Sequence, residues 1–264
     1  MAARSDKPFD THCHLNDERF ADDLSKMISQ VDSEMAGCIC ASYDFESSLK
    51  AVEIAQRSEK IFASVGMHPH SAKDMTEEVL ARFPRLLEND RVVALGETGL
   101  DYYYDYSPRD VQKYWFIRQF ELGIQIGMPV IIHVRDAYGD MMDILRGYKG
   151  RMPDGVMHCY SGSIEIAREL LDMGFYISFA GSVTFKNADR LREVAKAIPS
   201  DRLLIETDAP YMAPVPYRGQ RNCPVYVREI AETLARERGC DISELIAQTN
   251  ENAFRLFRIG GGKK

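Results

Sequence analysis

Short apolar runs alternate with longer amphipathic segments along the chain of 264 residues. A short apolar run bounded by polar residues is typical of a buried strand, whereas apolar residues that recur every three to four positions indicate a helix. This pattern predicts eight strands, at residues 9–12, 37–41, 62–66, 92–96, 130–133, 156–158, 175–179 and 203–206. The clearest helix follows Ser107, with Pro108 at its first position, and others are expected at 164–173, 189–198, 226–238 and 242–257.

Strict alternation of strands and helices favours a parallel sheet covered by helices, and eight such units fit closure into a (β/α)8 TIM barrel. The alternative is an open, doubly wound sheet. Polar residues at the ends of the first, fourth, fifth, sixth and eighth strands favour the barrel, because closure brings those ends around one mouth. We therefore expect one α/β domain over residues 1–264, with its active site at the C-terminal ends of the strands.

Histidine and carboxylate side chains stand at these strand ends. His12 and His14 are separated by one residue, so an extended strand directs both to the same face. The other candidates are Glu97, His133, His158 and Asp208. A single histidine in such a place is more often a hydrogen-bonded structural residue than a ligand. Six side chains at matching strand ends, however, indicate a centre that binds two metal ions.

A dinuclear hydrolytic centre needs neutral imidazoles for each ion, a carboxylate that bridges the ions and an open position for water. We assign His12, His14 and Asp208 to one ion and His133 and His158 to the other, with Glu97 as the bridge. Water between the ions should ionise near neutral pH, and Asp208 would accept its proton. Asp208 and Glu97 are thus the predicted catalytic residues. The ions are Mg²⁺, Mn²⁺ or Zn²⁺, and the sequence does not choose among them.

A second pair of histidines, His68 and His70, follows the third strand. This pair could be a further set of metal ligands. Because the first set is already complete, we prefer a contact between His68 and the substrate. His70 then either also contacts the substrate or only packs the loop. Arg135 lies two residues after His133 and so on the same side of its strand. Its guanidinium suits a bidentate contact to phosphate, the alternative being an ordinary salt bridge at the rim.

Two further carboxylates, Asp10 and Glu206, lie two residues before ligands of the first and eighth strands. Alternation would place them on the same face, one layer deeper, where either could orient a ligating imidazole or pair with a buried cation. Arg218, Arg221 and Asn222 follow the eighth strand. We expect Arg221 to contact the substrate, the alternative being that this cluster is a solvated surface turn.

Composition and charge exclude some classes of function. The formal net charge of −7 argues against a protein that coats nucleic acid through a broad basic surface, although it leaves a phosphodiester substrate open. No apolar run approaches the length of a membrane span, and the first residues lack the apolar region of a secretory signal. The six cysteines form no Cys-x-x-Cys pair. We expect a cytoplasmic monomer with reduced thiols and no membrane partner.

The motifs that carry this chemistry resemble those of one family, the TatD-type metal-dependent deoxyribonucleases within the amidohydrolase-like barrels. They are FDTHCHL at 9–15, GMHPH at 66–70, GETGLDY at 96–102, HVRDA at 133–137, HCYSG at 158–162, ETDAPY at 206–211, RGQRNCP at 218–224 and TNENA at 249–253. The resemblance implies a (β/α)8 barrel, the same six ligands, and 3'-5' exonucleolytic hydrolysis of DNA linked to DNA repair or degradation. One departure is Cys223, where the family pattern leads us to expect an acidic residue before Pro224.

Three functions remain open on the sequence. The first is a nuclease that acts on single-stranded DNA or frayed ends, in which Arg135 and His68 hold the phosphate. The second is an amide, ester or lactone hydrolase of the same superfamily, including a deacylase of aminoacyl-tRNA. Glu97 favours the nuclease, because related barrels with carbonyl or triester substrates often bridge their metals with a carboxylated lysine. The third is a metal-stabilised scaffold or nucleic-acid-binding module without catalysis.

Overall fold

All eight predicted strands are present in the computed structural model, which describes residues 6–260. They form one parallel sheet whose spatial order is the order of the sequence, from β1 to β8. The strands are β1 Phe9–Cys13, β2 Gly37–Cys40, β3 Ile61–Val65, β4 Val92–Asp101, β5 Val130–Arg135, β6 Gly155–Met157, β7 Tyr176–Phe179 and β8 Leu203–Ile205. The prediction of a (β/α)8 barrel is confirmed, and the open doubly wound alternative is wrong.

The barrel closes through backbone contacts just beyond the ends of β1 and β8. Cys13 and Ala209 form a parallel bridge, and the N–H of His14 donates to the carbonyl of Ala209 at 2.6 Å. The N–H of Asp208 donates to the carbonyl of His12 at 2.8 Å. The first and last strands therefore meet at the level where His12, His14 and Asp208 lie, which brings together residues almost two hundred positions apart in the chain.

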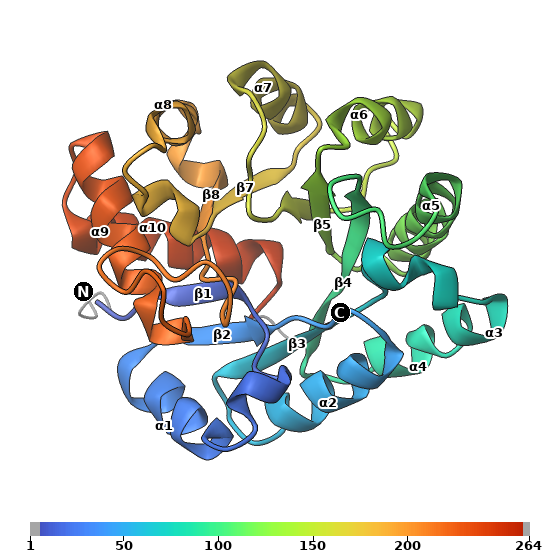
Figure 1. Ribbon diagram of the computed structural model, residues 1–264, viewed down its shortest axis with the longest axis horizontal. Coiled ribbons are helices and arrows are strands. Elements are labelled where there is room, and N and C mark those ends of the chain that lie inside the picture. Colours follow the sequence, from blue (N-terminus) through green and yellow to red (C-terminus); the bar gives the residue numbers. More distant parts are fainter. Residues whose placement is uncertain (1–5, 261–264) are drawn as a thin grey trace.

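Helices form a ring outside the strands (Figure 1). They are α1 Leu24–Glu34, α2 Phe45–Ala55, α3 Glu77–Leu80, α4 Phe83–Leu87, α5 Arg109–Ile126, α6 Tyr138–Gly147, α7 Ile164–Asp172, α8 Asp189–Ala197, α9 Val227–Arg238 and α10 Ile242–Leu256. Their ends follow local chemistry. Asp44 begins α2 with a capping box, in which its side chain accepts from the N–H of Ser47 at 2.7 Å. Pro108 precedes α5 as its N-cap, one position before the place predicted for it.

The inside of the barrel has an apolar floor beneath a polar layer. The floor is built from one or two residues of each of seven strands and from the end of α10, namely Phe9, Ile39, Val93, Ala94, Ile131, Val156, Tyr176, Leu204, Ala253, Leu256 and Phe257. Two positions after Ile131, Val156 and Leu204, the chain carries His133, His158 and Glu206. Because side chains alternate along a strand, these polar groups project into the barrel directly above the floor.

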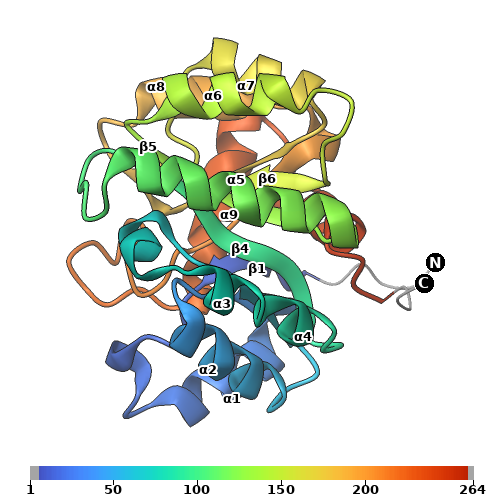
Figure 2. The ribbon, with the colours of Figure 1, turned by 90° about the vertical axis from the view of Figure 1, so that its right-hand side faces the viewer.

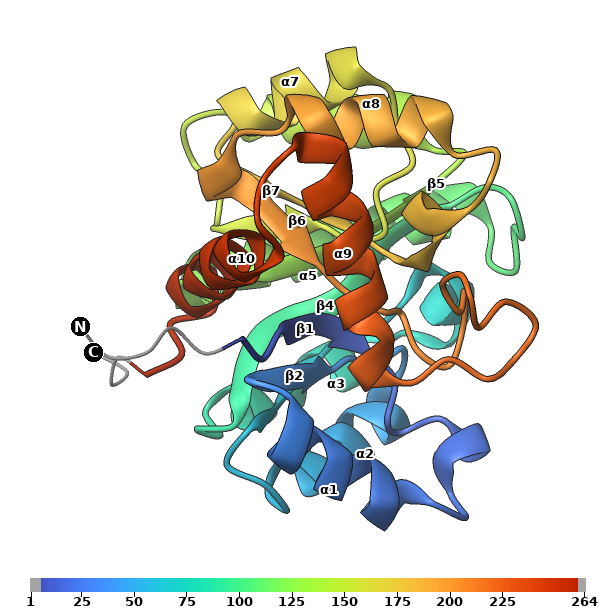
Figure 3. The ribbon, with the colours of Figure 1, turned by 90° about the vertical axis from the view of Figure 1, so that its left-hand side faces the viewer.

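The mouth of the barrel lies at the C-terminal ends of the strands. The loop after β4 (green) and the loop after β8 (orange) project from this end, on the right of Figure 3, while α10 lies toward the left. The view from the other side shows the same two loops at one end of the molecule (Figure 2). Within residues 6–260, no helix combines the length and apolar character needed to cross a lipid bilayer.

Strand β4 differs most from its prediction, because it continues through ten residues to Asp101 instead of ending at residue 96. Gly99 makes this extension possible. Its φ of 151° is unfavourable for other residues, and a Cβ there would stand 1.9 Å from the carbonyl oxygen of His133 on the neighbouring strand. The two strands thus approach closely at the level of the polar layer, which holds His133 near Glu97.

A matched pair of substitutions tests this close approach. Gly99→Ala should lower the free energy of unfolding by about 2–5 kcal/mol, because it adds a backbone clash to an unfavourable φ. Gly139→Ala in α6 meets open space and should raise that free energy by up to about 1 kcal/mol through helix propensity. Urea unfolding followed by circular dichroism measures both. Equal stability of the two variants would contradict this account of β4 and β5.

Candidate metal centre

The carboxylate of Glu97 lies at the centre of the polar layer. Its Oε2 is 3.2 Å from Nε2 of His12, which comes from the opposite side of the barrel mouth. Its Oε1 is 2.8 Å from Nδ1 of His133 and 2.7 Å from Nε2 of His158. Each oxygen of one buried carboxylate therefore faces a different group of imidazoles, as a carboxylate that bridges two cations must.

The first group surrounds Oε2 of Glu97. Nε2 of His12 and Nε2 of His14 are 3.2 Å apart, and Oδ1 of Asp208 is 3.3 Å from the ring of His14 and 3.8 Å from that of His12. Ligand atoms arranged tetrahedrally around an ion at about 2.1 Å stand roughly 3.4 Å from one another. The spacing of these donors and their mixture of imidazole and carboxylate thus fit a divalent metal ion.

The second group surrounds Oε1 of Glu97. Nδ1 of His133 and Nε2 of His158 are 3.2 Å apart, and both lie within hydrogen-bonding distance of that oxygen. Three protein donors leave further positions for water or substrate, which is the arrangement typical of a catalytic rather than a structural metal site. The protein side of this site is therefore suited to bind an ion that remains accessible from the mouth.

Outer contacts hold several of the candidate ligand rings in place. Nδ1 of His14 lies 3.0 Å from the carbonyl oxygen of Ala41, and Nε2 of His133 lies 3.1 Å from Oδ2 of Asp101. Nδ1 of His158 lies 3.3 Å from Oε1 of Glu206, a close electrostatic contact that forms no hydrogen bond. A hydrogen on the outer nitrogen leaves the lone pair of the inner nitrogen directed toward the ion. The partners of His14 and His133 thus favour the tautomer that metal binding would need.

Comparison with known proteins gives the family of this chain. A family model described as "TatD related DNase" matches residues 9–258. The chain belongs to the TatD family of metal-dependent hydrolases. The sequence resemblance to that family is thereby confirmed over nearly the whole chain.

Individual relatives of this TatD-family protein differ in what their names state. The protein named "Uncharacterized metal-dependent hydrolase YabD" from Bacillus subtilis (strain 168) is 46% identical over 95% of this chain and 99% of its own length. The protein named "3'-5' ssDNA/RNA exonuclease TatD" from Cronobacter sakazakii is 34% identical over 94% of this chain and 97% of its own. The crystal structure of YJJV, a TatD homologue from Escherichia coli K12, superposes with a TM-score of 0.88 at 26% identity, covering 95% of this chain and 98% of that one.

Asp101 is a site residue that sequence reasoning missed. Its Oδ2 lies 2.9 Å from Nε2 of His70 and 3.1 Å from Nε2 of His133. The carboxyl is buried, yet hydrogen bonds from those two rings hold its pKa well below its usual range. Extension of β4 explains its position, because Glu97 and Asp101 are four residues apart on one strand and so face the same way. A prediction that continued β4 to residue 101 would have found it.

His68 and His70 do not converge on one point. Nδ1 of His68 accepts the N–H of His70 at 3.1 Å, which assigns the hydrogen of the neutral ring to Nε2, 3.4 Å from Oε1 of Glu97. Burial lowers the pKa of His68 to about 3, so this ring is neutral. His70 instead faces Asp101. His70 therefore does not share a metal site with His68, although His68, Glu97 and His133 lie close enough together to hold an ion.

Asp10 does not contact the ring of His12. A register irregularity between Asp10 and Cys13 interrupts the alternation of β1, which the sequence analysis assumed to be strict. Asp10 accepts from the N–H groups of His12 and Thr207 at 3.1 and 2.9 Å and from the hydroxyl of Thr207 at 2.5 Å. Its carboxylate therefore ties β1 to the segment after β8. Among the described residues, Nδ1 of His12 has no hydrogen-bond partner.

The arginines expected near the substrate have different surroundings. Arg135 lies over the rings of Tyr103 and Tyr104, with its guanidinium carbon 3.9 and 4.9 Å from their centres. Arg221 forms an ion pair with Asp23 at 2.6 Å. Its contact with the substrate stays a prediction, and it would require that pair to open.

The other two members of the predicted polar cluster after β8 also separate. Arg218 lies 3.7 Å from the ring centre of Phe185. Asn222 is buried and donates to the carbonyl oxygens of Thr207 and Tyr211 at 2.9 and 2.7 Å. Asn222 thereby braces the turn that carries Asp208.

Charges within the centre compensate one another. Burial disfavours the charged form of Glu97, but His158, His68 and His12 hold the pKa of its carboxyl well below the usual range. Burial likewise disfavours protonated His158, but Glu97 and Glu206 raise its pKa well above normal. Burial instead lowers the pKa of His12 and of His68, so protons that balance the carboxylates lie on other imidazoles such as His158, and a metal ion would replace such protons on binding.

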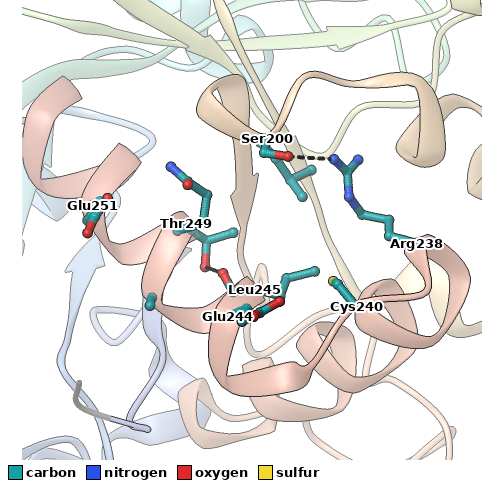
Figure 4. A pocket seen from close by; sticks show the side chains of 10 residues that line it. Ser200, Arg238, Cys240, Glu244, Leu245, Thr249 and Glu251 are labelled. Atoms are coloured by element: carbon teal, nitrogen blue, oxygen red, sulfur yellow. Dashed lines mark hydrogen bonds between the residues drawn. The ribbon is translucent and has the colours of Figure 1, made fainter. Parts of the chain in front are cut away.

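A separate cavity lies far from this centre. It has a volume of about 290 Å³ and is lined by Leu203 at the start of β8, Arg238 at the end of α9, Cys240 in the connection that follows, and residues of α10. Figure 4 shows the guanidinium of Arg238 directed at Ser200, to whose hydroxyl it donates at 3.2 Å. It also donates to the carbonyl of Ile198 at 2.8 Å. This cation already has partners, so the cavity does not compete with the metal centre as a site of chemistry.

Substitution of Asp101 tests its role as the partner of His133. Asp101→Asn should weaken the binding of Mn²⁺ or Zn²⁺ by about 10- to 100-fold, because a neutral amide orients the imidazole less strongly. Calorimetric titration of the metal-depleted protein measures the affinity. Asp105→Asn, in the same loop but in an exposed pair with Arg109, is the matched control. An affinity of Asp101→Asn within about twofold of the control would contradict the assignment.

Proposed function

We propose that this protein is a two-metal phosphodiesterase that removes nucleotides from single-stranded 3' ends of nucleic acid. The observation that carries the proposal is the position of Glu97, whose two oxygens face two imidazole groups at an open barrel mouth. Relatives at 34% and 33% identity that bear the name "3'-5' ssDNA/RNA exonuclease TatD" support the same choice of substrate.

Each candidate ion has its own protein ligands under this proposal. His12, His14 and Asp208 hold one, His133 and His158 hold the other, and Glu97 belongs to both. Two divalent ions, whether Mg²⁺, Mn²⁺ or Zn²⁺, would lower the pKa of a water molecule and stabilise negative charge on the phosphoryl oxygens. The protein supplies the positions, the outer hydrogen bonds and the proton acceptor.

Asp208 is that acceptor. Burial disfavours its charged form, but the hydrogen bond and charge of His14 lower the pKa of its carboxyl, so Asp208 is ionised at neutral pH. Its φ of 55° turns the chain away from β8 and leaves the carboxylate partly open to the mouth. An ionised carboxylate beside the attacking water can take its proton as the bond to phosphorus forms.

His68 and Arg135 provide contacts for the phosphate. His68 is a neutral donor whose Nε2 lies on the Oε1 side of Glu97. Arg135 stands two residues after His133 on β5, with its guanidinium held against tyrosine rings. A planar guanidinium can make two parallel hydrogen bonds to phosphate oxygens. Together the two residues would position the phosphodiester between the metal ligands and the rim.

Metal reconstitution of the depleted protein tests the function. Purified protein is treated with chelator, reloaded with Mg²⁺, Mn²⁺ or Zn²⁺, and assayed on single- and double-stranded oligonucleotides labelled at the 5' end. We expect a ladder of products that shortens from the 3' end, only with metal and mainly with single strands. Hydrolysis of activated esters, lactones or aminoacyl-tRNA without cleavage of any oligonucleotide would replace the nuclease with a carbonyl hydrolase.

Two substitutions test the assigned roles. Asp208→Asn should reduce kcat by about 10²- to 10⁴-fold, the usual loss when a proton acceptor is removed. Glu97→Ala should abolish cleavage, because both groups of ligands lose their shared carboxylate. Asp189→Asn, an exposed residue at the start of α8, is the control for the loss of a carboxylate charge. Folding is checked by circular dichroism, and full activity of either site variant would refute the assignment.

A further inference from the structure

Three exposed tyrosines occupy the loop that follows β4, next to the metal centre. Tyr103, Tyr104 and Tyr106 expose 58%, 44% and 57% of their surface. Burial of a large aromatic side chain stabilises a folded protein, and this stabilisation is lost when the ring stays exposed to water. Three such rings on one short loop therefore call for an explanation. We name Tyr103, Tyr104 and Tyr106 together the tyrosine cluster.

The tyrosine cluster is anchored to the metal centre through a single carboxylate. Oδ1 of Asp101 accepts the N–H groups of Tyr103 and Tyr104 at 3.0 and 2.9 Å. The other oxygen of Asp101 lies against His133 and His70. The loop is therefore held in a fixed position relative to a metal ligand, which is what a substrate-binding surface requires.

Contacts among the rings leave them at the surface. Tyr104 and Tyr106 stack with centres 5.2 Å apart and an interplanar angle of 24°, and both meet the ring of His70 edge-on, at 5.2 and 4.9 Å. Tyr103 packs edge-on against Tyr104 at 4.9 Å. The cluster thus forms a continuous aromatic surface that leads from His70 toward solvent.

The hydroxyl groups of the cluster have no structural task that the described residues reveal. Nearby Tyr102 donates to Asp140 at 2.6 Å, and Tyr114 donates to Glu77 at 2.9 Å. Across residues 6–260, by contrast, no hydrogen bond joins a hydroxyl of the tyrosine cluster to another group. Hydrogen bonds of the hydroxyls therefore do not explain why these three rings lie at the surface.

A cation completes this surface. Arg135 places its guanidinium over Tyr103 and Tyr104, and the described part of the chain offers it no carboxylate partner. An arginine stacked on aromatic rings keeps its N–H edges free for phosphate while its charge stays close to the rings. An aromatic surface beside an unpaired arginine matches a nucleotide, which offers a flat base and an anionic phosphate.

We propose that the tyrosine cluster and Arg135 form a stacking platform for an unpaired base next to the phosphate that is cleaved. The proposal rests on the proposed nuclease function and specifies how the site selects single strands. A net charge of −7 provides little general attraction for nucleic acid, so local stacking has to supply binding. Bases stack on aromatic rings without regard to sequence, but only a base released from its duplex partner exposes its face at such a loop.

The test combines substitutions of tyrosines in the protein with removal of bases from the substrate. Tyr103→Ala, Tyr104→Ala and Tyr106→Ala are compared with the corresponding Phe variants on a single-stranded oligonucleotide and on the same oligonucleotide with abasic residues at its last two 3' positions. Loss of one stacked base weakens binding roughly tenfold. We expect Ala variants at the contacting ring to raise KM for the natural strand by about that factor, with kcat little changed, whereas Phe variants retain wild-type KM.

The abasic substrate separates stacking from a structural role. Wild-type protein should show a raised KM for it, and the Ala variants should add little further loss, because the contact is already absent. Tyr114→Ala on α5 removes another exposed tyrosine and serves as the control. Two results would contradict the stacking platform and leave the proposed function intact. One is that the Ala variants raise KM equally for natural and abasic strands. The other is that they change only the oligomeric state in gel filtration. Failure of wild-type protein to cleave either strand would overturn the proposed function and the platform with it.

Discussion

Burial of the Glu97 carboxylate is the constraint on which the site depends. A buried carboxylate is unstable unless cations or hydrogen-bond donors surround it, and here three imidazoles lie within 3.2 Å of its two oxygens. Removal of any one of these groups would leave part of the charge unpaired. The candidate ligands are therefore mutually dependent, because each imidazole helps to offset the buried charge of the same carboxylate.

Barrel closure satisfies this constraint. The imidazoles come from strands at opposite sides of the barrel, and only contacts between the ends of β1 and β8 bring His12 and Asp208 together. Asp10 strengthens that seam by accepting hydrogen bonds from both sides of it. A residue expected to orient a ligand thus acts on the backbone that carries two ligands, which is a structural contribution to the same centre.

Asp101 connects the metal centre to the rim. One of its oxygens faces His133, and the other receives the backbone of the loop that carries the tyrosine cluster. The orientation of a candidate metal ligand and the position of the proposed stacking platform consequently depend on one side chain. The length of β4 makes this double contact possible, because Glu97 and Asp101 lie on the same face of the strand at two depths in the barrel.

Sequence by itself determined the alternation of elements, the barrel and the set of strand-end histidines and carboxylates, because apolar periodicity and residue chemistry are local properties. It misjudged the end of β4 and the hydrogen-bond partners of Asp10, since the close approach at Gly99 and the meeting of β1 with the segment after β8 depend on neighbouring strands. Tertiary structure alone decided which oxygen of Glu97 faces which imidazoles, the neutral donor state of His68 and the junction at Asp101. Those features arise from distances between segments far apart in the chain, which no local pattern of residues records.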